Sequence, residues 1–201
     1  DRDALERLIA DWTDPDPAPL AVVPAEPPAA PRPDAEIDVA ALRRDWLAMQ
    51  DSHEFFGLLR RHRVGRVQAL RLAGGDLTRR VGSDAPTRLL ELASAGAVPI
   101  MVFVGNRGCV QIHTGPVKRI VPHGPWINVL DPEFNLHLRT DLAVESWLVR
   151  KPTSNGMLTA RDDYDAAGEQ AGLFVGTRDR GEPERADWRA LLAKLGGEDW
   201  V

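Results

Sequence analysis

The chain has 201 residues, 43% of them hydrophobic, which is enough to fill the core of one sizeable domain and argues against disorder throughout. Its formal net charge of −5 argues against nucleic-acid binding, because an excess of cations drives that binding. A single cysteine, Cys109, excludes an intramolecular disulfide framework, so we expect a reducing compartment, the cytoplasm. No apolar run is long enough to span a bilayer, so we expect no membrane insertion.

The beginning of the chain predicts a short helix and a linker. Residues 1–12 place Leu5, Leu8 and Ile9 on one face of an amphipathic helix. Eight prolines between residues 14 and 37 favour an extended linker. The chain starts without a methionine, which suggests a fragment or a processed product. Because the first helix is similar to ERADWRALLAKL at 184–195, it is either the tail of a missing copy of the domain or a chance likeness.

Three further helices are expected before residue 99. Apolar residues at helical spacing from 39 to 49 predict the first, with Asp38 as its cap. Asp51 followed by Glu54 has the form of a capping box, which places His53 in the first turn of a helix that runs to about residue 62. The motif SDAP opens the third helix, at about residues 85–95, with Pro86 at an early helical position.

From residue 99 the pattern changes to strands separated by turn residues at hairpin spacing. The expected strands are PIMVFVG, CVQIHTG, VKRIV, WINVL, FNLHLR, VESWLVR, GMLTARDDYD and AGLFVGTRD. Their short connections predict an antiparallel meander. The sequence therefore predicts an α+β fold, in which N-terminal helices pack on a large antiparallel sheet and a C-terminal helix closes the domain. No glycine-rich phosphate loop follows a strand, which argues against a nucleotide-binding fold.

The histidines give few signals of chemistry. None of the five lies in an HExxH motif, and no GxSxG motif is present, so neither a zinc nor a serine hydrolase is supported. His53 is the strongest candidate for a ligand, because the positive end of a helix dipole disfavours protonation of a first-turn imidazole. The residues alone leave two interpretations open for His53, a metal ligand or a partly exposed helix-start residue.

Several cations pose a similar choice between a solvated surface and a site for carboxylates. One group lies in the last turn of the helix that His53 opens and just after it, and the other lies at the ends of predicted strands. These residues are Arg60, Arg61, Arg63 and Arg66, and then Arg150, Lys151 and Arg178. Spacing along the chain does not decide whether they converge.

Four blocks of sequence resemble one family. They are WLAMQDSHEFF, MVFVGNRGCVQIHTGPV, GPWINVLDPEFNLHL and WLVRKPTSNG. Between about residues 38 and 195 the chain resembles the bacterial haemin-degrading, or haem-utilisation, family of HemS-like proteins. Members look like two tandem α+β halves, and this chain resembles the C-terminal half. The resemblance implies that residues 1–13 are the tail helix of a missing N-terminal half, 14–37 the linker, and 38–201 the haem-binding domain.

The resemblance also implies the site. Haem (iron protoporphyrin IX) would be the bound group, and the histidine of the family's HxFF element, here His53, would be the axial ligand to its iron. Basic residues around the haem propionates fall on Arg66, Lys151 and Arg178. Relatives often carry Gln and Tyr where this chain has Leu173 and Val175, so polar contacts at the haem edge would be lost. The family's distal arginine belongs to the absent N-terminal half.

The implied function is that of a cytoplasmic haem-binding protein of haem uptake and iron acquisition. In one version the domain degrades haem, as a haem-oxygenase-like enzyme that releases iron. In the other it is a non-catalytic carrier that delivers haem to a separate haem oxygenase, and a haem importer is a further candidate partner. A third alternative is an assembly half that holds no haem without its N-terminal partner. Pairing with that half, or with a second copy of this chain, is expected in the tandem arrangement.

Overall fold

The computed structural model describes residues 1–16, 30–106, 108–179, 181–197 and 200. Most of the proline-rich segment, residues 17–29, lies outside the described residues. Helix α1 (Arg2–Trp12) forms as predicted, with Asp1 as its cap, and it buries no residue. Its apolar residues Leu5, Leu8, Ile9 and Trp12 are all exposed. None of the helices in the described ranges combines the length and apolar character needed to cross a bilayer.

The next helices form one layer that includes α2 (Val39–Leu47), α3 (Glu54–His62) and α4 (Arg66–Ala73). Asp38 caps α2 as predicted, because its carboxylate accepts the N–H of Ala41 at 2.9 Å. Helix α3 begins one residue after His53, so the prediction that His53 lies in its first turn was wrong by one position. Helix α4 was not predicted, because its N-cap Gly65 supplies no side-chain signal. A short 3-10 helix (Asp34–Glu36) precedes this layer.

Among the described residues, nine strands form two antiparallel sheets. The six-stranded sheet has the order β1-β7-β8-β9-β2-β3 and the three-stranded sheet the order β4-β5-β6. The strands are β1 (Thr78–Val81), β2 (Ile100–Gly105), β3 (Val110–Gly115), β4 (Ile120–His123), β5 (Trp126–Asp131), β6 (Phe134–Arg139), β7 (Glu145–Thr153), β8 (Gly156–Tyr164) and β9 (Gln170–Gly176). The α+β class and the antiparallel pairing are confirmed.

The prediction of one continuous meander was wrong. Strand β2 pairs with β9, which follows it by about seventy residues, and the chain leaves the large sheet after β3. Pro116 comes directly after β3 and lacks the N–H that another ladder bond would need. Strand β1 was also missed, and it pairs with β7 rather than with a neighbour in the sequence.

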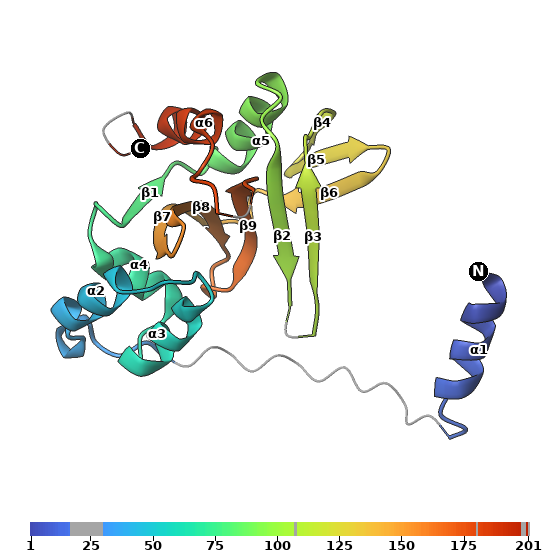
Figure 1. Ribbon diagram of the computed structural model, residues 1–201, viewed down its shortest axis with the longest axis horizontal. Coiled ribbons are helices and arrows are strands. Elements are labelled where there is room, and N and C mark those ends of the chain that lie inside the picture. Colours follow the sequence, from blue (N-terminus) through green and yellow to red (C-terminus); the bar gives the residue numbers. More distant parts are fainter. Residues whose placement is uncertain (17–29, 107, 180, 198–199, 201) are drawn as a thin grey trace.

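The six-stranded sheet is covered differently on its two faces. Leu148 of β7 belongs to a core with α5 (Ala85–Ala95), α6 (Ala186–Gly196) and the small sheet. Its neighbours Trp147 and Val149 belong to a second core with α2, α3 and α4. Figure 1 shows these two groups of helices at opposite ends of the domain. Helix α6 is the closing C-terminal helix that was predicted.

Trp188 of α6 anchors the first core against the sheet. Its side chain is fully buried, and its indole N–H donates to the Thr159 carbonyl at 3.0 Å. Gly176 lies directly against this ring, so that a Cβ at that position would overlap it. The glycine is therefore required by close packing between β9 and α6.

We expect Gly176→Ala to lower the free energy of unfolding by about 1–3 kcal/mol, because the added methyl overpacks the core. Gly57→Ala is a matched control, since a Cβ there meets nothing within 4 Å and Gly57 lies inside α3. That control should stabilise the domain by about 0.5–1 kcal/mol through helix propensity. Urea unfolding of both variants measures the two effects, and a wild-type midpoint for Gly176→Ala would contradict the packing argument.

Candidate functional site

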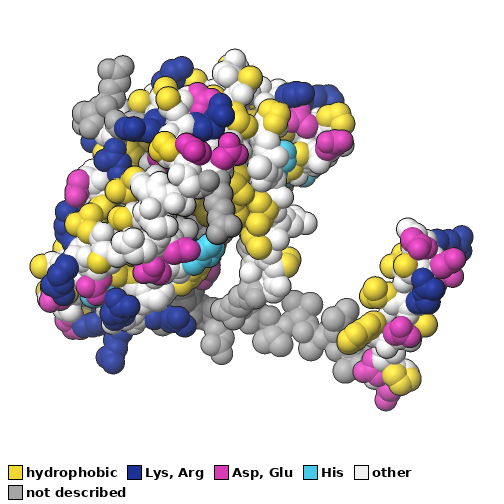
Figure 2. All heavy atoms as spheres, viewed as in Figure 1, with side chains coloured by type: hydrophobic (Ala, Val, Ile, Leu, Met, Phe, Trp, Pro, Cys, Tyr) yellow, Lys and Arg dark blue, Asp and Glu magenta, His cyan; other side chains and the backbone are white. Residues whose placement is uncertain are grey.

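A cavity of about 1450 Å³ lies between the helical layer and the six-stranded sheet. Helices α2–α4 cover only part of that face of the sheet, so the strands beyond them form a wall of the cavity. Figure 2 shows hydrophobic side chains gathered along β2 and β3 beside the hollow. The apolar side chains of this wall come from four strands and are Phe103, Val110, Ile112, Leu158, Ala160, Leu173 and Val175.

The wall is built by strand alternation. Residues two apart on a strand share a face, and antiparallel partners continue that face across the sheet. Phe103 is paired with Ile112 on one side and with Leu173 on the other, and Val175 is paired with Ala160. Val110 and Ile112 are both more than half exposed, which is unusual for large apolar side chains in a strand. The surface therefore suits a large flat apolar ligand.

The opposite wall is aromatic and comes from the first turn of α3. Phe55 is buried and meets Trp46 edge to face, with ring centroids 4.7 Å apart. Phe56 is 56% exposed and also lines the cavity. The anchored ring of Phe55 therefore fixes the helix start, while Phe56 remains available to a ligand.

His53 lies at the rim of the same cavity, just before α3. Its side chain is 89% exposed, and its Nδ1 is 2.6 Å from Oδ1 of Asp51. The His53 backbone N–H donates to that same oxygen at 2.8 Å. These hydrogen bonds, the backbone one first, lower the pKa of the Asp51 carboxyl. Within the described part of the chain, these hydrogen bonds use the backbone N–H and Nδ1 of His53, and none involves Nε2.

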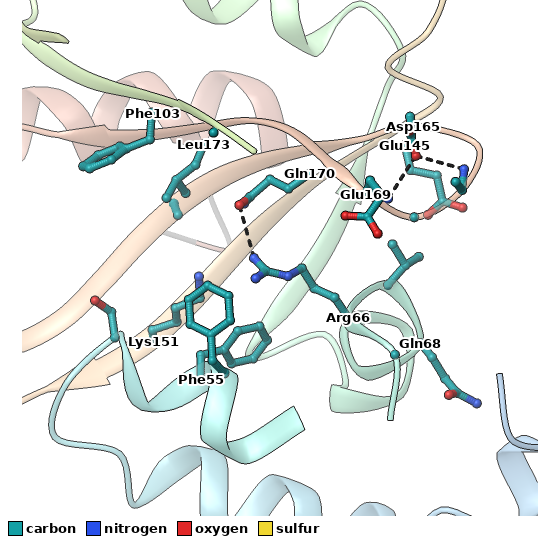
Figure 3. Close-up of a pocket in the computed structure, with 18 of the residues that line it drawn as sticks. Phe55, Arg66, Gln68, Phe103, Glu145, Lys151, Asp165, Glu169, Gln170 and Leu173 are labelled. Atoms are coloured by element: carbon teal, nitrogen blue, oxygen red, sulfur yellow. Dashed lines mark hydrogen bonds between the residues drawn. The ribbon is translucent and has the colours of Figure 1, made fainter. Parts of the chain in front are cut away.

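Two of the cations that line the cavity, Arg66 and Lys151, come from separate elements, as Figure 3 shows. Arg66 begins α4, and its guanidinium donates to Oε1 of Gln170 at 3.3 Å. It also lies over the rings of Phe56 and Phe55, at 4.8 and 5.7 Å from their centroids. Lys151 comes from β7, and its ammonium lies 4.8 Å from the Phe55 centroid. The predicted cations Arg66 and Lys151 therefore converge beside one aromatic ring.

Lys151 is held by a buried carboxylate beneath the cavity. Its side chain is 7% exposed, and its Nζ lies 3.8 Å from Oδ2 of the fully buried Asp162. Tyr164 donates its hydroxyl to the same oxygen at 2.9 Å, and burial raises the pKa of this phenol so that it keeps its proton. Burial lowers the pKa of Lys151, and the charge of Asp162 opposes that shift. A ligand carboxylate would supply Lys151 with a second anionic partner.

Arg178 does not share this arrangement. It follows β9, donates to Oγ1 of Thr153 at 3.4 Å, and is not among the residues that line the cavity. Arg60, Arg61 and Arg63 do not line the cavity either, in keeping with their interpretation as helix surface. The structure thus brings three of the four predicted site residues together, namely His53, Arg66 and Lys151.

Three of the other four histidines have local partners. Nε2 of His62 lies 3.0 Å from Asp45, His113 stacks on Phe134, and Nδ1 of His137 lies 2.7 Å from the Asn128 amide oxygen. Among the residues that the structure describes, no group of three or more His, Cys, Asp or Glu side chains could hold a metal ion.

The sequence did not single out Asp162, Tyr164 or Gln170 for the site. Alternation along GMLTARDDYD could have placed Asp162 and Tyr164 on the same face as Leu158 and Ala160. Alternation alone could not show that Lys151 of the neighbouring strand β7 reaches Asp162, because that contact depends on how β7 pairs with β8.

Comparison with known proteins places the chain in a family. The model of the haemin-degrading HemS/ChuX domain matches residues 63–195. The chain belongs to this HemS/ChuX family. The matched segment contains Arg66, Lys151 and Arg178, while His53 lies before it.

Curated HemS relatives extend the similarity to nearly the whole chain. The hemin transport protein HmuS of Yersinia pestis is 41% identical over 199 residues, which cover 99% of this chain and 57% of the relative. The hemin transport protein HemS of Yersinia enterocolitica is 40% identical over the same shares. The chain therefore spans little more than half the length of these relatives.

Solved structures of HemS-like proteins share the fold. Holo-PhuS, a haem-binding protein from Pseudomonas aeruginosa, is 46% identical with a TM-score of 0.91, over 97% of this chain and 57% of that chain. ChuS, an E. coli haem oxygenase, is 40% identical with a TM-score of 0.84, over 97% of this chain and 57% of ChuS. The haem-binding protein ChuX has a TM-score of 0.63 at 8% identity, over 78% of this chain and 96% of that chain, which shows the fold alone.

Proposed function

We propose that this domain binds haem in the cavity, with Nε2 of His53 as the axial ligand to the iron. The observation that carries the proposal is the convergence of three chemical features on one cavity. An imidazole lies at its rim, apolar walls face each other across it, and two cations reach it from α4 and β7. Haem needs all three, because it combines a ligand-binding iron, a flat apolar ring and two carboxylates.

The walls account for most of the expected affinity. Phe56, held in place by the buried Phe55, would contact one side of the porphyrin, and the sheet residues around Ile112 and Val175 the other. The cavity exceeds the roughly 300–1,000 Å³ of most small-ligand sites, so a macrocycle fits without rearrangement of the fold. Burial of apolar surface contributes about 25 cal/mol per Å², which makes the large faces of the ring the main source of binding energy.

The cations would bind the propionates. In the free protein Arg66 donates to a neutral amide oxygen of Gln170, and a carboxylate is a stronger acceptor for a guanidinium than an amide is. Lys151 shares Asp162 with Tyr164 and would gain from a second anion. Arg178 remains a prediction from the family resemblance, because it would have to leave Thr153 to meet the same ligand.

For the biological role we propose a cytoplasmic haem carrier in haem uptake and iron acquisition, which delivers haem to a separate oxygenase. The apolar wall supports this role, since the side chains of Leu173 and Val175 offer no hydrogen bond at the haem edge that would orient the ring for a reaction. Haem itself would supply any redox chemistry, and the residues of this chain would hold and orient it. Degradation of haem is the second candidate, which the haemin-degrading family model and the similarity to ChuS favour.

Replacement of His53 by Ala should abolish the Soret and visible bands of a histidine-ligated haem complex, because the proposed axial nitrogen is lost. Titration with haemin followed by absorption spectroscopy measures this. His62→Ala is the matched control, since His62 contacts Asp45 and does not line the cavity. A His53→Ala spectrum identical to that of the wild type would refute the assignment.

Haem affinity should fall as the pH rises through the lowered pKa of Lys151, at a pH below the ordinary value of 10.5. The sign follows because a propionate favours the charged ammonium, which deprotonation removes. The Lys151→Gln variant should bind haem about 10-fold more weakly near neutral pH, and its haem affinity should lack the fall caused by deprotonation of Lys151. Haemin titrations of the wild type and the variant across the alkaline range measure the difference between their pH profiles of haem affinity. Effects of pH on haem itself are the same for both proteins and cancel in that difference. Parallel pH profiles would contradict the role of Lys151.

Incubation of the haem complex with a protein reductant and catalase should leave the haem intact if the domain is a carrier. Catalase is needed because free peroxide degrades haem without an enzyme. Chromatography of the extracted pigment gives the result directly. An open-chain tetrapyrrole formed in the presence of catalase would instead establish the haem-degrading alternative.

A further inference from the structure

The residue that holds the His53 ring is Asp51. One carboxylate oxygen, Oδ1, lies 2.6 Å from the ring Nδ1 and accepts the His53 backbone N–H at 2.8 Å. The loop around it is fixed from both sides. Gln50 donates its N–H to Oε1 of Glu54 at 3.2 Å, and its carbonyl accepts the N–H of Ser154 at 2.7 Å. Asp51 is therefore anchored between α3 and the turn that joins β7 to β8.

The contact decides which nitrogen of His53 carries the proton. An ionised carboxylate only accepts hydrogen bonds, so Nδ1 of a neutral His53 must be the donor. Nε2 then keeps its lone pair and is the nitrogen free to ligate. The backbone N–H of His53 holds the same oxygen, so the position of Oδ1 is fixed. Rotation of the ring would therefore carry Nδ1 away from Oδ1 and break their hydrogen bond.

We propose that Asp51 is a positioning residue for the haem ligand: it fixes the tautomer and the orientation of His53 and strengthens donation from Nε2. This inference rests on the proposed function, since it gives Asp51 a role through His53. Carboxylates that accept the second ring N–H of a metal-bound histidine raise its basicity, and their loss typically lowers metal affinity 10–100-fold. In the free protein both side chains are largely exposed, so a bound ligand that excludes water would strengthen their interaction.

A second aspartate and histidine pair, which joins α2 to α3, provides a comparison. Asp45 contacts His62 through Nε2, at 3.0 Å, and Arg61 shares that carboxylate at 3.2 Å. Neither Asp45 nor His62 lines the cavity. Asp45→Asn therefore removes a charge of the same kind from the same helical layer without touching His53.

The test compares Asp51→Asn, Asp51→Ala and Asp45→Asn as full-length haem complexes. Asn has nearly the same shape as Asp and can still accept both hydrogen bonds, but it carries no charge. We expect Asp51→Asn to keep histidine ligation while its iron reduction potential becomes more positive, because the ligand donates less electron density. Asp51→Ala should release haem to a haem-scavenging protein about 10–100-fold faster than the wild type. Asp45→Asn should match the wild type in both measurements.

The outcomes separate the inference from the proposed function. If both Asp51 variants show the wild-type potential and haem release, while His53→Ala loses histidine ligation, the role of Asp51 is refuted and haem binding by His53 stands. If His53→Ala keeps histidine ligation, both proposals fall together. Unfolding midpoints of the variants serve as a check on the fold, and a merely structural role for Asp51 would change those midpoints without shifting the potential.

Discussion

The two-residue alternation of the six-stranded sheet is the constraint on which the cavity depends. It sends Leu148 to the core beneath α5 and α6, and its neighbours Trp147 and Val149 to the core beneath α2–α4. The same alternation turns Lys151 towards the cavity, while Arg150 lies over the Trp200 ring. A shift of one residue in the register of β7 would exchange these side chains and remove the cation from the cavity.

A buried charge is the second feature that shapes the site. Lys151 and Asp162 are both almost completely removed from water, and such pairs contribute little net stability because desolvation offsets their attraction. Their arrangement is easier to understand as preparation for a ligand. Asp162 and the Tyr164 hydroxyl keep an ammonium in place beside the apolar walls of the cavity, where a carboxylate on a large ring could reach it. The proposed function would thus account for a pair that stability alone does not require.

Sequence reasoning was most successful where structure is determined locally. The caps and turns placed α2, α5 and β2 to β9 close to their observed bounds, because these signals lie within a few residues. Strand β1 and the pairing of β2 with β9 depend on residues far apart in the sequence, so no local pattern could give them.

The candidate site shows the same division. Helix-start electrostatics were only consistent with a ligand at His53, and the family resemblance selected it. Arg66 and Lys151 line the cavity together with His53, whereas Arg178 does not. The support that Asp162 and Asp51 give to these residues becomes visible only when distances are known, since neither spacing nor composition marks a carboxylate as the partner of one particular cation or ring.

The most direct test of the central claim, that this cavity is the haem site, is paramagnetic broadening of amide resonances on addition of haemin. Ferric haem broadens the resonances of nuclei close to it, so the loss of signal maps its position. The account predicts that Phe56, Ile112 and Val175 lose intensity first, while Asn128 and His137 of the small sheet keep theirs. Broadening centred on the small sheet or on α6, with the cavity residues unaffected, would contradict it.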